Sequence, residues 1–174
     1  MHLSVTAIGA DRPGIVAAVA EVLVEHACNI EDSRMAILGG HFSMMLVVAP
    51  GDRTDPAALE RDLRAAGEAL GLTLDVRTIE DLASAAPLGS PHVLSVYGSD
   101  RPGIVHDVSS LLAKAGVNIV DLRTQVAGHD PPVYLMLMDL EVPGDPAGLE
   151  QRLKELAAER GIDVSLRPAD ADTL

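Results

Sequence analysis

The hexapeptide Asp-Arg-Pro-Gly-Ile-Val occurs twice in this chain, at residues 11–16 and 100–105. Proline and glycine ahead of an apolar helical pattern are typical of a turn that opens a helix, whose first backbone amides have no partner within the helix. Those amides lie at the positive end of the helix dipole and favour a carboxylate, and a glycine without Cβ allows close approach to the backbone. We therefore expect the amides that follow Pro13 and Pro102 to form candidate ligand sites.

The charged residues of the hexapeptide leave alternatives open. Asp11 and Asp100 are expected to cap the helix by accepting hydrogen bonds from its first amides, and the hexapeptide can then be a helix start and nothing more. Arg12 and Arg101 are either solvated arginines that pair with a nearby carboxylate, or they hold an anionic ligand or an acidic side chain of a partner. The candidate site is completed by Gly14, Ile15, Gly103 and Ile104.

The hexapeptides belong to a longer internal repeat. Residues 9–34 and 98–123 align without a gap and are identical at 13 of 26 positions. Such self-similarity predicts a duplicated module, here residues 1–80 and 92–168. Residues 81–91 are mostly small and are interrupted by proline and glycine, which favours a linker, and residues 169–174 form an acidic tail.

Each copy shows the same order of predicted elements. In the first, residues 3–8 read as a strand, and the turn then opens a helix with apolar residues at three- and four-residue steps. Two more strands, at 29–37 and 42–48, a second helix marked by Leu59, Leu63 and Leu70, and a last strand at 72–79 follow. The order βαββαβ predicts an α+β fold of two ferredoxin-like modules, each with a four-stranded antiparallel sheet and two helices on one face.

The third strand of each copy is apolar at nearly every position, at residues 42–49 and 133–142. A strand with helices on one face and water on the other is expected to alternate. We therefore expect the free sheet faces to meet another sheet, with the repeats associating within the chain and two chains forming a homodimer.

Composition excludes several classes of function. The net charge is −13 and Lys114 and Lys154 are the only lysines, so direct binding of nucleic acid is not expected. No apolar run approaches the roughly 20 residues of a membrane span, which predicts a cytoplasmic protein without a membrane partner. The six histidines lack the spacing of zinc ligands, and we expect no metal, no cofactor and no catalytic residue.

The two turns, GADRPGIV and GSDRPGIV, are followed by HACNIEDSR and AGVNIVDLR. Together with the βαββαβ order, these segments resemble the ACT domain, a small-molecule sensing module, over residues 2–80 and 91–168. The resemblance implies amino acid sensing, with ligand contacts from the first turn and from the start of the second strand, here Asn29, Ile30, Asn118 and Ile119. Each asparagine follows a helix and is either its C-cap or a ligand contact near the mouth of the same turn.

We thus expect a non-enzymatic regulatory protein that binds a small amino acid, with glycine or serine favoured, at the boundary between the repeats. The ligand carboxylate would bind the turn amides, and its ammonium group would bind an asparagine or, alternatively, Asp11 or Asp100. A protein partner such as a basic DNA-binding regulator would transmit the signal in transcriptional regulation, as the resemblance implies. The alternative is an interaction module or accessory enzyme subunit without a ligand. Because His106 and Asp107 replace Ala17 and Ala18, we expect unequal sites.

Overall fold

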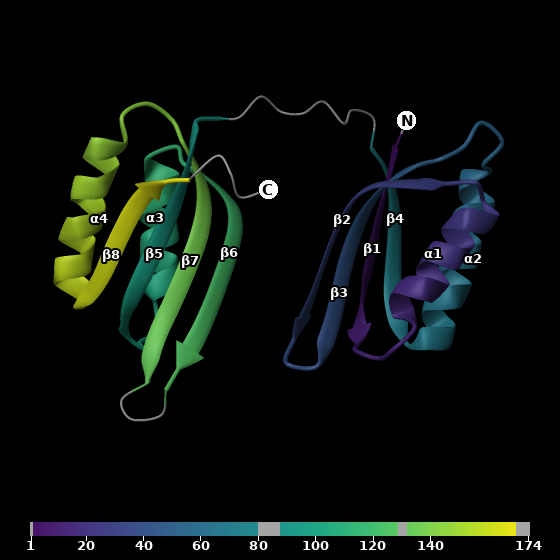
Figure 1. The fold of residues 1–174 in the computed structure, drawn as a ribbon, viewed down its shortest axis with the longest axis horizontal. Helices are drawn as coiled ribbons and strands as arrows, with labels where there is room; N and C mark the ends of the chain where they lie inside the picture. The colour runs from purple at the N-terminus through teal and green to yellow at the C-terminus, as the bar shows by residue number, and fades with distance from the viewer. Residues whose placement is uncertain (1, 80–87, 129–131, 170–174) are drawn as a thin grey trace. The chain divides into compact units, whose positions relative to one another are not determined.

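The computed structural model describes residues 2–79, 88–128 and 132–169 and divides into two units, Met1–Ser84 and Ala85–Leu174. Both units have the predicted order βαββαβ (Figure 1). The first contains β1 (His2–Ala10), α1 (Ile15–Glu25), β2 (Asn29–Leu38), β3 (His41–Ala49), α2 (Pro56–Leu70) and β4 (Leu72–Ile79). The second contains β5 (Ser90–Ser99), α3 (Ile104–Lys114), β6 (Asn118–Ala127), β7 (Val133–Val142), α4 (Pro146–Arg160) and β8 (Ile162–Pro168).

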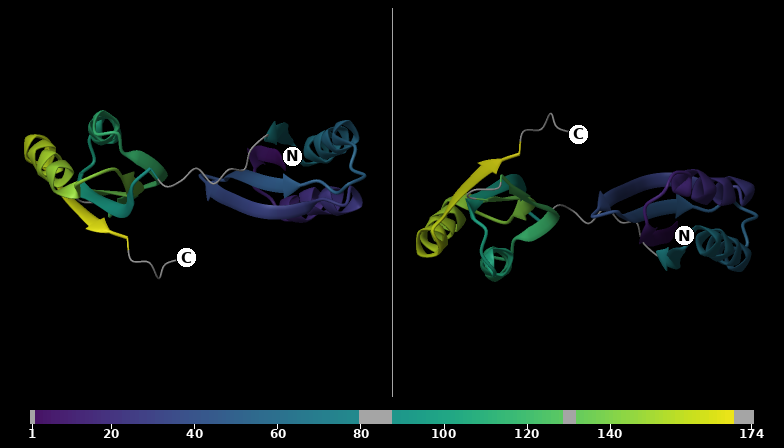
Figure 2. Two further views of the ribbon diagram at one scale, coloured as in Figure 1. Left: turned by 90° about the horizontal axis from the view of Figure 1, so that it is seen from above. Right: turned by 90° about the horizontal axis from the view of Figure 1, so that it is seen from below.

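Each unit has one antiparallel sheet, ordered β2-β3-β1-β4 in the first and β6-β7-β5-β8 in the second. Both helices of a unit cover the same face of its sheet (Figures 1 and 2). The predicted fold class, two α+β modules of the ferredoxin-like type, is confirmed. Most of the predicted linker at 81–91 lies outside the described residues, but β5 already begins at Ser90.

The core of each unit lies between the sheet and its two helices. In β1 the buried residues alternate, so that Leu3, Val5 and Ala7 face the helices. The buried positions of α1 follow the helical period and pack in the same cluster. The second unit repeats this arrangement with Leu94 and Val96 of β5.

The second helix of each unit begins with a side-chain cap. Asp55 accepts a hydrogen bond of 3.0 Å from the amide of Ala57, and Pro56 occupies the first turn of α2. Asp145 accepts the equivalent bond in α4, at 3.1 Å. In both helices the capping aspartate directly precedes the proline that starts the helix, and the starts of α1 and α3 can be compared with this arrangement.

The third strands keep apolar side chains on the sheet face that the helices do not cover. Met45 of β3 is 55% exposed and Leu137 of β7 is 39% exposed, whereas their neighbours Met44 and Met138 are buried. An apolar free face is typical of a surface that packs on another protein surface. Its pairing with another sheet, within the chain or in a homodimer, stays a prediction.

Candidate functional site

The two Pro-Gly turns have the same unusual backbone. Gly14 has φ 95° and ψ −10°, and Gly103 has φ 100° and ψ −10°. These angles match the third residue of a type II turn, for which proline is common at the second position and glycine is favoured at the third. The turn therefore requires glycine, because a residue with Cβ at positive φ is strained.

The prediction that Asp11 and Asp100 cap the first helices is wrong. The N-cap positions are Gly14 and Gly103, and no side chain in the described part of the chain caps either helix. Three residues, Arg12, Pro13 and Gly14, separate Asp11 from the first residue of α1, so the carboxylate lies too early in the sequence to reach the first amides. The main chain of Asp11 instead donates to the Gly40 carbonyl at 2.9 Å, which joins the turn to the β2–β3 hairpin.

The absence of a side-chain cap leaves the first amides of α1 and α3 open. The first intrahelical bonds run from Ala18 to Gly14, at 3.0 Å, and from Asp107 to Gly103, at 2.9 Å. The amides of the three preceding residues in each helix have no acceptor within that helix. Both copies therefore have amides without a helical acceptor at the predicted place, and ligand binding by them stays a prediction.

Ile15 and Ile104, two predicted site residues, are core residues with exposed fractions of 2% and 5%. Their side chains anchor the start of each helix, and only the backbone of these residues is suited to contact a polar ligand.

The two arginines of the repeated turn differ. Arg12 Nη2 donates a hydrogen bond of 3.2 Å to the carbonyl of Ala69 in the last turn of α2. Arg101 makes no hydrogen bond or ion pair with any residue in the described ranges 2–79, 88–128 and 132–169. Neither arginine pairs with a carboxylate of those residues, although both are exposed to solvent as the first alternative requires, and a ligand contact by Arg101 stays a prediction.

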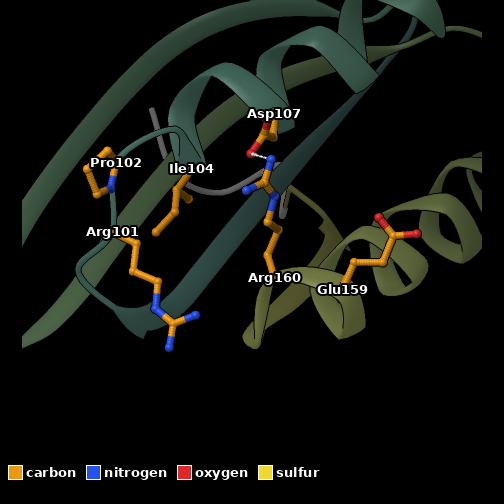
Figure 3. A pocket seen from close by; sticks show the side chains of 6 residues that line it. All are labelled: Arg101, Pro102, Ile104, Asp107, Glu159 and Arg160. Carbon is orange, nitrogen blue, oxygen red and sulfur yellow. Dashed lines mark ion pairs between the residues drawn. The ribbon is translucent and has the colours of Figure 1, made fainter.

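A pocket of about 160 Å³ lies between the start of α3 and the end of α4 (Figure 3). Arg160 extends from α4 toward Asp107 on α3, and Arg160 Nη2 lies 2.6 Å from Asp107 Oδ2. No described residue forms a hydrogen bond of ordinary geometry with this buried oxygen, so the contact is an ion pair only. Arg101 and Pro102 of the turn, Ile104 and Glu159 complete the lining.

A second, more open hollow of about 410 Å³ lies beside the same turn. It is lined by Arg101, Gly103, Ile104, Val105, His106 and Tyr134. Burial raises the pKa of the Tyr134 phenol, and a hydrogen bond with Thr124 lowers it by a smaller amount. The phenol therefore stays neutral at physiological pH and does not oppose an anion in this hollow.

The asparagines do not lie at the mouth of the same turn, so this prediction is wrong for a single module. The turn follows Ala10, which pairs with His41 at one end of β3, whereas Asn29 pairs with Ala49 at the other end. Eight residues of strand separate the two places by about 27 Å. The cause is that α1 crosses the sheet before β2 begins.

The second copy repeats this separation. Asn118 pairs with Glu141 of β7, and its side-chain Nδ2 donates to the Glu141 carboxylate at 3.0 Å. The C-cap positions are His26 and Ala115, so neither asparagine is a C-cap. Ile30 and Ile119 lie beside the asparagines at this far end, Ile30 exposed and Ile119 half-buried.

Sequence reasoning missed Arg160, Glu159 and Tyr134 as lining residues. Arg160 could have been found by aligning the two copies. In that alignment α4 corresponds to α2, and Arg160 takes the position that Leu70 has in the first copy. A charged residue at a position that is apolar in the other copy indicates a local difference in chemistry. Among the described residues, no group of three or more His, Cys, Asp or Glu side chains is arranged to hold a metal.

Known families match both units. A model of the ACT domain matches residues 1–77 and another ACT model matches residues 92–161. The glycine cleavage system transcriptional repressor of Escherichia coli is 29% identical over 170 residues, which cover 95% of this chain and 88% of the relative. A phosphoserine phosphatase of Mycobacterium tuberculosis is 31% identical over 167 residues, but these cover only 39% of that enzyme.

A solved structure of an unknown protein from Galdieria sulphuraria superimposes with a TM-score of 0.80 and 31% identity, covering 97% of this chain and 98% of that one. The duplicated βαββαβ fold and the two family matches define a tandem ACT-domain protein. This chain belongs to the ACT-domain family, and its two repeats are both ACT domains. Within the described residues, no helix is long and apolar enough to cross a membrane.

Proposed function

We propose that this chain is a non-enzymatic regulatory protein that binds a small amino acid, glycine or serine, and acts through a protein partner in the manner that the repressor's name suggests. The observation that carries the proposal is the start of α3, where open amides lie beside Arg101, a cation without a partner among the described residues. Membership of the ACT-domain family and the likeness to the repressor support a sensing role.

The ligand carboxylate binds the first amides of α3 and the Arg101 guanidinium. Gly103 matters because any other residue is strained at its positive φ, and a Cβ at this place would lie 3.6 Å from Asp107 Oδ2. The equivalent start of α1 has the same amides, but Arg12 already donates to Ala69. The second copy is therefore the better anion site of the two, in line with the expectation of unequal sites.

Asn29 and Asn118 contribute to such a site only if another module presents them, because each lies at the far end of its own module. Asp11 and Asp100 lie directly before the turn and are the alternative partners for a ligand ammonium group within one module. Substituting Asn118 by alanine distinguishes these cases: unchanged ligand affinity assigns the site to a single module.

The partner is proposed to be a basic, DNA-binding regulator in the cytoplasm. A chain with a net charge of −13 and only Lys114 and Lys154 as lysines is suited to a basic protein surface and not to phosphate backbones. The phosphatase relative does not argue for catalysis, because this chain matches less than half of that enzyme. An accessory or interaction module without a ligand remains the second candidate, supported by the exposed apolar residues Met45 and Leu137.

Titration calorimetry of the full chain with glycine and serine tests the proposal. Gly103→Val is expected to abolish binding, and Gly14→Val, which introduces the same strain in the other copy, is expected to retain it. Circular dichroism establishes that both variants are folded, and Arg101→Gln, which leaves the turn intact, provides an independent loss of affinity. Equal affinity in Gly14→Val, Gly103→Val and Arg101→Gln would contradict the assignment.

A further inference from the structure

The two ACT domains differ at one pair of facing positions on their helices. In the second domain Asp107 of α3 and Arg160 of α4 form an ion pair at 2.6 Å. The equivalent residues in the first domain are Ala18 of α1 and Leu70 of α2, and Leu70 packs against the core. Both positions differ between the domains, with two apolar residues in the first and two opposite charges in the second.

A gain in fold stability does not explain why the second domain has a charged pair at these positions. The Asp107 side chain is 17% exposed, so its charge is largely removed from water. Replacing such a pair by apolar side chains is often neutral or stabilising, because desolvation offsets the attraction between the charges. The first domain shows that this fold accepts the apolar pair.

The position of Asp107 relative to the turn indicates what the charge can do. Asp107 lies one helical turn after Gly103, and helical side chains lean back toward the N-terminus. A Cβ placed on Gly103 would lie 3.6 Å from Asp107 Oδ2. The carboxylate of Asp107 is therefore next to the open backbone amides, and this buried oxygen accepts no hydrogen bond from the described residues.

The pocket thus places a carboxylate oxygen, paired with the Arg160 guanidinium, beside anion-binding groups. In an α-amino acid a single carbon joins the ammonium group to the carboxylate, so one ligand can engage both. Arg101 and the amides are suited to the carboxylate, and Asp107 is suited to the ammonium group. The pocket lining contains both cationic side chains, Arg101 and Arg160, and anionic ones, Asp107 and Glu159, as the two charges of a zwitterion require.

We propose that Asp107 is the residue that selects a zwitterionic α-amino acid, and that the ligand ammonium group displaces Arg160 from the Asp107 carboxylate. When the pocket holds no ligand, the Arg160 guanidinium pairs with the Asp107 carboxylate in place of that ammonium group. This inference rests on the proposed function and deepens it, because it restricts amino acid binding to the second ACT domain. The first domain has Ala18 at the equivalent position and therefore lacks this carboxylate.

Comparison of glycine with acetate, which has the carboxylate but no ammonium group, tests the inference. Calorimetry of the full wild-type chain is expected to show glycine binding at least about tenfold more tightly than acetate, since a hydrogen bond to a charged group is worth at least that factor. Asp107→Asn is expected to remove this preference and to leave acetate binding at or above the wild-type level. A change that only loosened the fold would weaken both ligands alike.

Two further variants complete the design. The double variant Asp107→Ala, Arg160→Leu gives the second domain the residues of the first, and it is expected to lose the preference for glycine while remaining folded by circular dichroism. Asp62→Asn is the matched control, because Asp62 forms an ion pair of 3.0 Å with His26 between the helices of the first domain. It is expected to bind glycine as the wild type does.

The outcomes distinguish the role of Asp107 from the proposed binding of amino acids by this chain. Binding of glycine that is unaffected by Asp107→Asn and by the double variant overturns the role of Asp107 and leaves the proposed amino acid sensor intact. Wild-type protein that binds glycine and acetate equally also overturns it. Failure of the wild type to bind glycine, serine or any other amino acid overturns both.

Discussion

Arg12 Nη2 donates a hydrogen bond of 3.2 Å to the carbonyl oxygen of Ala69, and this bond fixes the turn of the first ACT domain to the end of α2. A cation at a helix C-terminus also interacts favourably with the helix dipole. Arg101, at the same place in the second domain, makes no such contact with the described residues. The two identical hexapeptides thus differ, because the guanidinium of Arg12 is hydrogen-bonded to α2 and that of Arg101 has no partner among the described residues.

Gly14 and Gly103, which both adopt the left-handed backbone conformation, contribute to the stability of the two turns. Gly14→Ala and Gly103→Ala are each expected to lower the free energy of unfolding by about 1 to 2 kcal/mol, because Cβ strains a residue at positive φ. Urea denaturation measures the loss. Gly148→Ala is the control, since this glycine lies within α4 with open space around it, and the substitution should stabilise the chain by about 0.4 to 1 kcal/mol. Stabilisation by Gly14→Ala would contradict the turn geometry.

The Asp107–Arg160 pair should show strong coupling in stability. Arg160→Leu alone is expected to cost about 1 to 3 kcal/mol, because it leaves a largely buried carboxylate without a cation. The double variant Asp107→Ala, Arg160→Leu is expected to return to within about 1 kcal/mol of the wild type. A double-mutant cycle from urea denaturation checks this, and additive effects of the two substitutions would argue against the ion pair.

Asp62 gives the first domain an acid-sensitive contact. Hydrogen bonds from His26 and, secondarily, from Arg61 hold the pKa of Asp62 below its ordinary value of 3.8. A lowered native pKa stabilises the fold above that ordinary value, and the stabilisation is lost as the pH falls from 3.8 through the native pKa. NMR titration of the Asp62 carboxyl is expected to show this low pKa, and His26→Ala should raise it more than Arg61→Ala does. An Asp62 pKa that does not respond to His26→Ala would refute this account.

Assembly follows from the exposed apolar side chains. Because Met45 and Leu137 lie on sheet faces that their own helices do not cover, we expect a homodimer in solution. Light scattering at micromolar concentration should return twice the chain mass of 18.2 kDa. Met45→Glu with Leu137→Glu should shift the chain toward monomer, whereas a wild type that is strictly monomeric would rule the dimer out.

The acidic surface predicts no direct contact with DNA. The purified chain is expected not to retard duplex DNA in a gel at physiological salt, since its net charge of −13 repels the phosphates. Specific binding at nanomolar concentration by the chain alone would show that it does not need a basic partner.

Local patterns in the sequence predicted the fold because each depends on neighbouring residues. The repeat set the number of modules, and the apolar spacing of Ile15, Val19 and Leu23 set the buried face of α1. The start of the helices was less well determined, because Pro-Gly suits both a first helical turn and a type II turn. The capping prediction for Asp11 failed for this reason, whereas Asp55, directly before Pro56, is a true cap.

The site was harder to predict because its residues come from distant parts of the chain. Arg160 meets Asp107 only after α3 and α4 pack on the same sheet, and no spacing along one element reveals that contact. The misplaced asparagines have the opposite cause: Asn29 is near the turn in sequence, but the length of α1 carries it to the far end of the module. Aligning the two copies position by position partly makes up for this, because it shows where a charged residue of one copy replaces an apolar residue of the other.

A thermal melt of the full chain in the presence of each of the twenty amino acids tests the central claim of amino acid binding most directly. Ligand at about 100 times its dissociation constant stabilises a fold by about 2.7 kcal/mol. For a chain of this length, glycine or serine is therefore expected to raise the melting temperature by roughly 5 to 10 °C. A melting temperature that none of the twenty amino acids changes at millimolar concentration would contradict the claim and favour an interaction module without a ligand.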